Sequence, residues 1–107
     1  MIKKYLYFIT QVKKINAQYG LTRHEIALLD LSAQRYFANE FITVGELIRR
    51  GDIASQATLH AALKSLINKK LITTKISNED GRVRDVILAK LALQRYKQLD
   101  RAMTRLF

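Results

Sequence analysis

The 107-residue chain contains no cysteine and no proline. Without cysteine it can form no disulfide, no thiolate metal site and no thiol redox sensor. Its only histidines, His24 and His60, lie far apart in the sequence with no carboxylate cluster at ligand spacing, so we expect no metal site. Gly-rich phosphate loops are also absent, and nothing in the sequence assembles a nucleophile, a base and oxyanion donors. We therefore expect no enzyme activity and no cofactor.

The sequence also lacks any apolar run long enough to cross a bilayer. The lysine-bearing N-terminus is not followed by a small-residue cleavage site, which argues against a signal peptide. No segment is rich in glycine or serine, so we expect no linker and a single domain over residues 1–107. Apolar residues make up 49% of the chain, which is enough for a packed core. Together these features predict a globular, cytoplasmic protein.

Acidic residues are scarce: nine Asp and Glu face nineteen Lys and Arg, for a net charge of +10. Such an excess points to a polyanionic partner. Residues 1–20 and residues 89–107 each contribute +4, whereas residues 43–88 contribute only +3. The charge of the terminal segments therefore has two interpretations: it covers solvated outer helix faces, or it lies on faces that flank bound DNA.

Apolar spacing and capping signals predict two helices in the first part of the chain. Residues 2–19 are expected to form the first helix, because their apolar residues alternate three and four positions apart. Gly20 is a helix stop, and Thr22 with Glu25 forms a capping box at the start of the second helix. The apolar residues of the first helix are Tyr5, Phe8, Val12, Ile15 and Tyr19, and those that we expect the second to bury are Ile26, Leu29, Ala33 and Phe37.

Residues 43–68 predict a helix-turn-helix. A second capping box, Thr43 with Glu46, starts a short third helix that Gly51 ends. Ser55 is a good N-cap for the fourth helix. The apolar stripes of these two helices are Val44, Leu47 and Ile48 in the third, and Leu59, Ala62, Leu63, Leu66 and Ile67 in the fourth.

The rest of the chain predicts a hairpin and a last helix. Residues 71–76 and 83–88 are rich in β-branched residues, and the turn residues 77–81 join them. A short strand at residues 41–42 is an alternative to a plain loop. Residues 89–107 predict a helix whose apolar residues are Ala92, Tyr96, Leu99, Met103 and Leu106. The sequence therefore predicts a mainly α fold with a small β-hairpin, whose terminal helices cover a core or pair with another copy of the chain.

The polar side of the fourth helix is the first candidate site. Small residues let a helix backbone approach base edges closely, and Gln, Lys and Asn side chains can donate hydrogen bonds to bases. An ordinary solvated helix face has the same composition, but the short helix before it and the hairpin after it favour DNA reading. The side opposite the apolar stripe shows Ala57, Ala61, Lys64 and Asn68, flanked by Thr58, His60 and Ser65, with Gln56 at the N-terminal end.

The loop between the two strands is the second candidate site. Arg82 could enter a narrow minor groove, where the negative potential is greatest. Alternatively, Arg82 only pairs with Asp80 or Asp85 and stiffens the loop. Candidates for phosphate contacts are Lys75, Asn78 and Arg84.

These motifs resemble the MarR family of winged-helix transcriptional regulators. The similar segments are LTRHEIALLDLSA, ITVGELIRRGDIASQATLHAALKSLINKKLI and NEDGRVRDVILA, all within residues 21–89. The wing is the most specific part, because it has Asp80, Arg82, Val86 and Leu88 where the family has Asp-x-Arg followed by Val-x-Leu. The chain departs from the family pattern at two positions: Lys70 stands where a glycine commonly ends the recognition helix, and Ala89 stands where threonine is usual.

The resemblance implies a homodimer formed by the terminal helices, residues 1–20 and 89–107. The single long C-terminal helix is similar to that of the small, SarA-like members. Regulators of this type often bind phenolic ligands between the dimerisation helices and the DNA-binding lobe, and the alternative role of the tyrosines is packing. The tyrosines that could line such a pocket are Tyr5, Tyr19, Tyr36 and Tyr96. The DNA contacts implied by the resemblance come from Ser55, Gln56, Thr58, His60, Lys64 and Arg82.

The leading interpretation is a homodimeric regulator that binds double-stranded DNA at a roughly palindromic site, through a helix-turn-helix (43–68) and a wing (71–88). Two alternatives stay open: a winged-helix module that grips an acidic protein, and a plasmid or phage replication factor or architectural DNA-binding protein. A small-molecule effector is compatible with each of them but is not identified. The candidate DNA-binding residues are Ser55, Gln56, Ala57, Thr58, His60, Ala61, Lys64, Asn78, Arg82 and Arg84.

Overall fold

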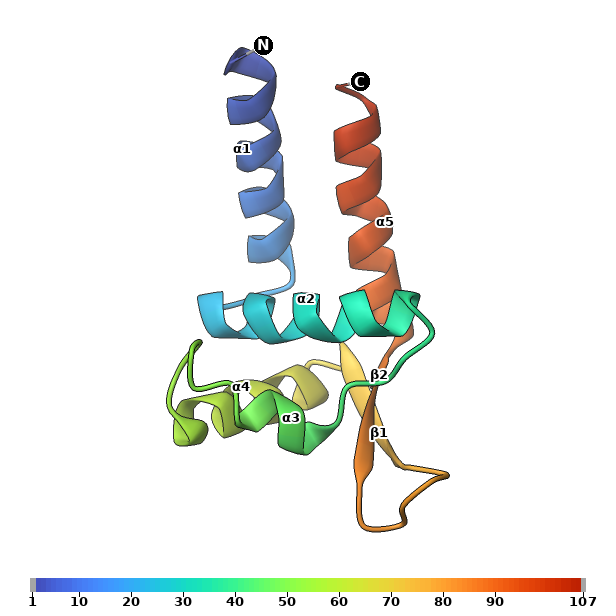
Figure 1. The fold of residues 1–107 in the computed structure, drawn as a ribbon. Helices are drawn as coiled ribbons and strands as arrows, with labels where there is room; N and C mark the ends of the chain where they lie inside the picture. The colour runs from blue at the N-terminus through green and yellow to red at the C-terminus, as the bar shows by residue number, and fades with distance from the viewer. Residues whose placement is uncertain (1, 107) are drawn as a thin grey trace.

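A computed structural model describes residues 2–106 and shows helices, one hairpin and short loops (Figure 1). The chain has a winged-helix fold: a helix-turn-helix is followed by an antiparallel hairpin and a final helix. The elements are α1 (Ile2–Gln18), α2 (Arg23–Phe37), α3 (Val44–Ile48), α4 (Gln56–Asn68), β1 (Ile72–Ile76), β2 (Arg84–Leu88) and α5 (Lys90–Thr104). The predicted fold class, mainly α with a hairpin wing, is confirmed.

Helices α1 and α5 lie side by side and project together from the rest of the molecule, with both chain ends at the far tip (Figure 1). We call this pair the arm, and the remainder, α2 to β2, the lobe. The molecule is elongated, with extents of 48 × 27 × 23 Å. None of the residues of α1, all of which are described, is fully buried. The arm therefore makes little core of its own within one copy of the chain.

The core lies in the lobe, where α2, α4 and the hairpin meet (Figure 1). Its buried apolar side chains come from the inner faces of α2, α3 and α4, from both strands, from the loops before α3 and β1, and from the first turn of α5. They are Leu28, Leu29, Ala33, Ile42, Leu47, Leu59, Ala62, Leu63, Leu66, Leu71, Ile72, Val86, Leu88 and Ala92. Removing such leucines from water is the main stabilising term for a domain of this size.

Both predicted capping boxes are present and fix where α2 and α3 begin. The Thr22 side chain accepts from the Glu25 amide at 3.3 Å, and the Thr22 amide donates to the Glu25 carboxylate at 2.9 Å. Thr43 and Glu46 form the same reciprocal pair. Because these bonds satisfy orphan amides of the first helical turn, each helix starts at the residue after its threonine.

The two departures from the family pattern have visible consequences. Lys70 adopts a left-handed backbone, with φ of 63°, so the conformation that glycine favours is present without a glycine. Ala89 occupies the N-cap of α5 and makes no side-chain capping hydrogen bond. The turn after α4 is therefore strained, and α5 starts without the usual cap.

Some sequence expectations were wrong in detail. Phe37 and Ile67, both assigned to buried stripes, are 62% and 40% exposed. Ile26, also predicted to be buried, is only half-buried. The buried residues of α2 are instead Glu25, Leu28, Leu29, Ser32 and Ala33. Of the two alternatives for residues 41–42, the loop is confirmed, and next to it an isolated bridge joins Thr43 to Asp85.

Candidate nucleic-acid interface

Helix α4 divides cleanly into an inner and an outer side. Leu59, Ala62, Leu63 and Leu66 are buried against the core. Of the four residues predicted to contact base edges, Thr58 is half-buried and the other three, Gln56, His60 and Lys64, are exposed. The small residues Ala57 and Ala61 on the same side are exposed as well. No large apolar side chain interrupts this outer side between residues 56 and 64, so a duplex can approach the helix backbone.

Ser55 and Thr58 hold the start of α4. The Ser55 Oγ accepts from the Thr58 amide at 3.2 Å and donates to Thr58 Oγ1 at 2.9 Å. Ser55 is exposed, whereas Thr58 is half-buried. Both hydroxyls are therefore committed to the cap, and their first contribution is to fix the helix N-terminus, whose free amides favour a phosphate.

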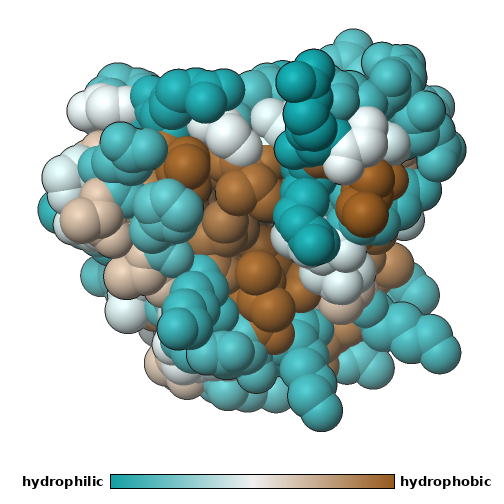
Figure 2. Space-filling model, turned by 90° about the horizontal axis from the view of Figure 1, so that it is seen from below, coloured by the Kyte–Doolittle hydropathy of each residue, from teal (hydrophilic) through white to brown (hydrophobic). Residues whose placement is uncertain are grey.

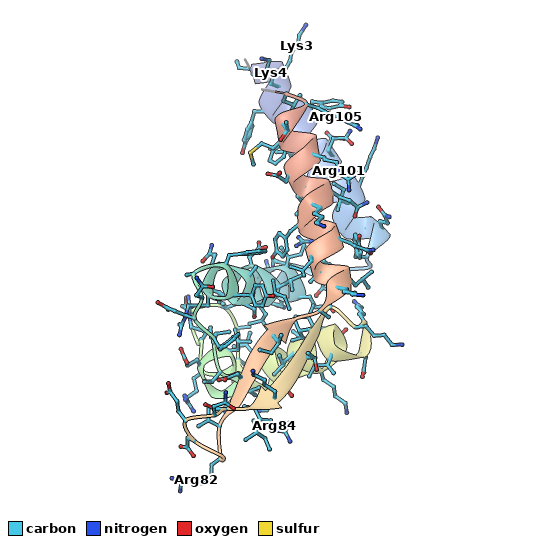
Figure 3. The ribbon with its side chains drawn as sticks, turned by 90° about the vertical axis from the view of Figure 1, so that its right-hand side faces the viewer. Lys3, Lys4, Arg82, Arg84, Arg101 and Arg105 are labelled. Atoms are coloured by element: carbon cyan, nitrogen blue, oxygen red, sulfur yellow. The ribbon has the colours of Figure 1, made fainter. Side chains whose placement is uncertain are left out.

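The hairpin projects beside α3 and ends in a loop that points away from the molecule (Figure 1). Its strands pair in register from Ile72 with Leu88 to Ile76 with Arg84. Figure 3 shows Arg82 at the extreme tip of this loop, where its side chain is 93% exposed. The loop is stiffened internally, because Asp80 accepts from the Arg82 amide at 3.0 Å while its carboxylate lies 3.5 Å from Arg82 Nε. Arg82 is thus both paired with Asp80 and fully presented to solvent.

The other three predicted wing contacts lie at different depths. Lys75 is exposed on β1, with its Nζ 5.4 Å from the centre of the Phe41 ring. Asn78 is exposed in the loop. Arg84 begins β2 and is exposed, and its guanidinium donates across the hairpin to Thr74 Oγ1 at 3.4 Å. Arg82 therefore lies at the tip of the hairpin, whereas Arg84 lies further back along it (Figure 3).

A groove of about 370 Å³ separates α3 from the hairpin. Its apolar walls come from Val44, Ile48 and Val83, and Arg49, Arg82 and Arg84 border it. Figure 2 shows this underside of the lobe as an apolar centre with a hydrophilic rim. Apolar contact with sugars or thymine methyl groups and arginine contact with phosphates are the interactions such a groove supports.

Arg49 was missed by the sequence analysis. It follows α3 as its C-cap, and its guanidinium lies over Gly45, where a Cβ would stand 3.0 Å from Arg49 Nη2. Glycine at position 45 therefore gives the arginine room to lie along the groove wall. The spacing of four residues between Gly45 and Arg49 was the only available signal.

Not every cation of this side is available for a ligand. Arg50 donates from Nε and Nη2 to the two carboxylate oxygens of Asp52, both at 2.9 Å. These hydrogen bonds hold the pKa of Asp52 below its usual value and raise the pKa of Arg50. The pair is self-satisfied, so the positive edge of the site is formed by Arg49, Lys64, Arg82 and Arg84.

The predicted tyrosines do not form one pocket. Tyr5 is 62% exposed near the start of α1, and Tyr19 donates to Gln98 at the base of the arm. Tyr36 and Tyr96 meet only through Phe37, whose ring lies edge-on to each, at centroid distances of 5.3 and 6.4 Å. Phe37 and Tyr96 also line an open apolar hollow of about 520 Å³ on one side of α5, together with Leu93, Lys97, Leu99, Asp100 and Met103.

The described residues provide no metal site, because nowhere between residues 2 and 106 do three His, Asp or Glu side chains gather around one point. Within the same range, no helix has the length and apolar character needed to span a membrane.

Comparisons with known proteins place this fold. No protein-family model matches the sequence, and a search of curated proteins found no match. Among solved structures, MepR of S. aureus in complex with DNA is similar with a TM-score of 0.71 and 15% identity, over 90% of this chain and 75% of that one. The transcriptional regulator Tm0710 of Thermotoga maritima gives a TM-score of 0.72 and 15% identity, over 97% and 71%. A MarR-like transcription regulator of Bacillus cereus gives 0.63 and 15%, over 97% and 71%.

At these identities the similarity concerns the fold. The chain shares the winged-helix architecture of MarR-type regulators along nearly its whole length, terminal helices included. The resemblance seen in residues 21–89 of the sequence is therefore confirmed in three dimensions.

Proposed function

We propose that the protein is a sequence-specific regulator of transcription that binds double-stranded DNA. The observation that carries the proposal is the exposed polar side of α4 together with a projecting hairpin whose exposed tip, Arg82, contacts Asp80. Helix α4 would enter the major groove, where Gln56, His60 and Lys64 meet base edges. Arg82 would reach the backbone or the minor groove beside it. Ala57 and Ala61 keep the helix backbone close to the bases, while Ser55 and Thr58 fix its N-terminus toward a phosphate.

The similar structures support this assignment. MepR was solved with DNA, and Tm0710 and the Bacillus protein are transcription regulators. The proposed division of the chain is a single winged-helix domain over residues 1–107, with a helix-turn-helix at 43–68 and a wing at 71–88. Asn78, Arg84 and the newly found Arg49 add phosphate contacts along the groove. We propose a cytoplasmic protein without enzyme activity, since this surface is suited to binding DNA and does not combine a nucleophile, a base and oxyanion donors.

A homodimer is the second part of the proposal. The arm exposes large apolar side chains that one copy leaves uncovered, among them Ile2, Tyr5, Leu6 and Met103. The hollow beside α5 is apolar and open, so a second copy packed there would bury this surface. Two recognition helices related by a two-fold axis then read a roughly palindromic site, with half-sites about one helical turn apart. The same junction of arm and lobe is where an effector would act on the dimer.

Selection of bound fragments from genomic DNA tests the function directly, since it reports site, symmetry and spacing together. We expect a palindromic site at promoters for the unchanged protein. Gln56→Ala should alter the preferred base at one position of each half-site, and Gln18→Ala, an exposed glutamine at the end of α1, is the matched control. Sites at replication origins or scattered fragments without a common sequence would instead support the replication or architectural alternatives. No enrichment at all would contradict DNA reading.

A further inference from the structure

The arm carries a line of cations that the proposed reading of DNA does not use. On α5 they are spaced so that successive members lie on one side of the helix. The line, which we call the basic stripe, is Lys90, Lys97, Arg101 and Arg105, with Gln94 between the first two. All five side chains are exposed, and the stripe spans about 22 Å at the rise of an α-helix. Its outer members, Arg101 and Arg105, lie at the opposite end of the molecule from Arg82 (Figure 3).

The stripe borders a groove of about 220 Å³ between the two arm helices. Arg101 and Arg105 form one wall with Gln98, and Gln11 of α1 faces them. This lining offers guanidinium and amide donors and contains no carboxylate. A groove rich in donors and lacking acidic residues suits an anion with several oxygen atoms.

The cations of the stripe are not neutralised within the chain. Across residues 2–106, neither Lys90, Lys97, Arg101 nor Arg105 forms an ion pair. Asp100 is the only acidic residue of α5, and it lines the apolar hollow on another side of the helix. By contrast Arg95, which lies off the stripe, is buried and bound to Asn16. Arg95 therefore has a structural role in α5, whereas the four cations of the basic stripe can contact solvent or a partner.

Arg101 and Arg105 lie on another side of α5 from the apolar hollow that a second copy would cover in the proposed homodimer. The uncovered apolar surface involves Leu99 and Met103, which lie on the hollow side of α5, whereas Arg101 and Arg105 line the separate groove toward α1. Only Lys97 of the stripe lies at the border of the hollow. A second copy can thus cover the apolar side without covering the two arginines.

We propose that the basic stripe and its groove form a second DNA-binding surface, which holds the phosphate backbone of a duplex without reading its sequence. A straight row of cations matches a linear polyanion with one charge per ~1.7 Å of axis. Protein interfaces centre instead on apolar and aromatic side chains, and the stripe has none. Because the arm and the wing lie at opposite ends of a molecule 48 Å long, a duplex on the arm is a different segment from the one on α4.

Fluorescence anisotropy with a labelled random-sequence duplex, over a series of salt concentrations, tests the surface. Arg101→Gln/Arg105→Gln removes two exposed cations, and glutamine keeps the helix propensity. We expect weaker binding at low salt and a log–log salt slope smaller by about 1.8 for each arm that contacts the duplex, because two phosphates per arm are no longer neutralised. Lys3→Gln/Lys13→Gln is the control, since it removes the same charge from positions that do not line the groove. If both variants bind equally weakly, net charge explains the effect and the inference is overturned. Unchanged binding in both variants would overturn it as well.

A third variant separates this inference from the proposed function. Lys64→Gln/Arg82→Gln weakens the reading surface and leaves the arm unchanged. We expect this variant to lose its sequence preference but to keep binding random duplex through the arm. If the Lys64/Arg82 variant binds as the unchanged protein does and only the Arg101/Arg105 variant binds more weakly, the proposed reading surface is refuted and the arm surface is supported. If only the Lys64/Arg82 variant loses binding, the arm inference fails and the reading surface stands.

Discussion

Lys69, just past the end of α4, donates from Nζ to both carboxylate oxygens of Glu25 in α2, at 2.9 and 2.8 Å. The same Nζ lies 2.6 Å from the Gly20 carbonyl, and Ser65 donates to Glu25 at 2.7 Å. One buried carboxylate, 2% exposed, therefore joins the end of α4 to the turn between α1 and α2. The angle of α4 on the lobe depends on this contact as well as on apolar packing.

The first prediction concerns this carboxylate. Burial alone raises the pKa of Glu25, but the hydrogen bonds from Lys69, Ser65 and Thr22 outweigh it and lower the pKa to about 2, from an ordinary value of 4.5. Because the pKa of Glu25 is lower in the folded than in the unfolded chain, its ionised form stabilises the fold at pH values above about 4.5. This stability is lost as the pH falls from about 4.5 to 2. Glu25→Gln should thus cost about 3 kcal/mol at pH 7 and much less at pH 2.

Urea unfolding at several pH values measures this difference. Glu79→Gln, on the exposed wing loop, is the matched control and should leave stability nearly unchanged. A constant difference between Glu25→Gln and the unchanged protein from pH 7 to pH 2 would contradict the assigned role of the carboxylate.

The second prediction uses the strained turn after α4. Lys70 has a positive φ, which costs a side-chain-bearing residue about 1 kcal/mol relative to glycine. Lys70→Gly should therefore raise the free energy of unfolding by roughly this amount. Lys64→Gly, in the middle of α4, should lower it by about 1 kcal/mol. Reduced stability in both variants would show that the left-handed turn is not present in solution.

The third prediction concerns the base of the arm. Arg95 is 1% exposed, and its Nε and Nη2 donate to Asn16 Oδ1 at 3.0 and 2.7 Å, while Nη1 has no hydrogen-bond partner within the described residues. Nη1 lies 3.8 Å from Asp30 Oδ1. Asn16→Leu removes both hydrogen bonds of the buried guanidinium, leaves this ion pair in place, and should cost about 2 kcal/mol. The double variant Asn16→Leu/Arg95→Met should recover most of that stability, because apolar side chains replace both polar partners. Thermal unfolding of a double-mutant cycle measures the coupling, and strictly additive costs would refute it.

The fourth prediction concerns the tip of the wing. Arg82→Ala should weaken binding to every DNA sequence and reduce the salt slope by about 0.9 for every phosphate that either wing no longer neutralises. The fold should be unaffected, since the side chain is 93% exposed. Binding isotherms at several salt concentrations measure both quantities, with Glu79→Ala on the same loop as the control. An unchanged slope would mean that Arg82 only stiffens its loop.

The fifth prediction tests the dimer. Met103 is 45% exposed and lines the apolar hollow beside α5. A carboxylate there would have to be desolvated in the dimer, so Met103→Glu should convert the dimer into a monomer at micromolar concentration. Sedimentation velocity measures this change. Thr104→Glu, one residue further along α5, should remain dimeric. A monomeric unchanged protein would refute the dimer itself.

Local signals in the sequence were enough to predict the elements. Each capping box places its helix start within a residue, and the β-branched runs give both strands, because these signals act between neighbours in the chain. Periodicity was less reliable at element ends: Phe37 and Ile67 follow the apolar pattern but lie at the last turns of their helices, beyond the packed region. Apolar spacing reports which side a residue lies on, and not how far the core extends along the helix.

The site was only partly accessible from the sequence. The exposed side of α4 and the projecting Arg82 follow from local patterns. The contact of Glu25 with Lys69 and the groove wall formed by Arg49 depend on elements brought together by folding. Glu25 had a sufficient local explanation as a capping residue, so nothing in the sequence indicated its second role.

The joint between the hairpin and α5 has a mechanical consequence. Ala89 leaves first-turn amides of α5 without a side-chain acceptor where the hairpin passes into the arm. The Ala89 amide donates to the Leu71 carbonyl at 3.0 Å, and the neighbouring Leu88 and Ala92 side chains are buried. Backbone pairing and apolar packing therefore join the lobe to α5, whereas the side chains of Glu25 and Lys69 tie the lobe to the turn after α1. In the proposed dimer, the angle between arm and lobe sets the separation of the two α4 helices, and thus the half-site spacing depends in part on how Leu88 and Ala92 pack.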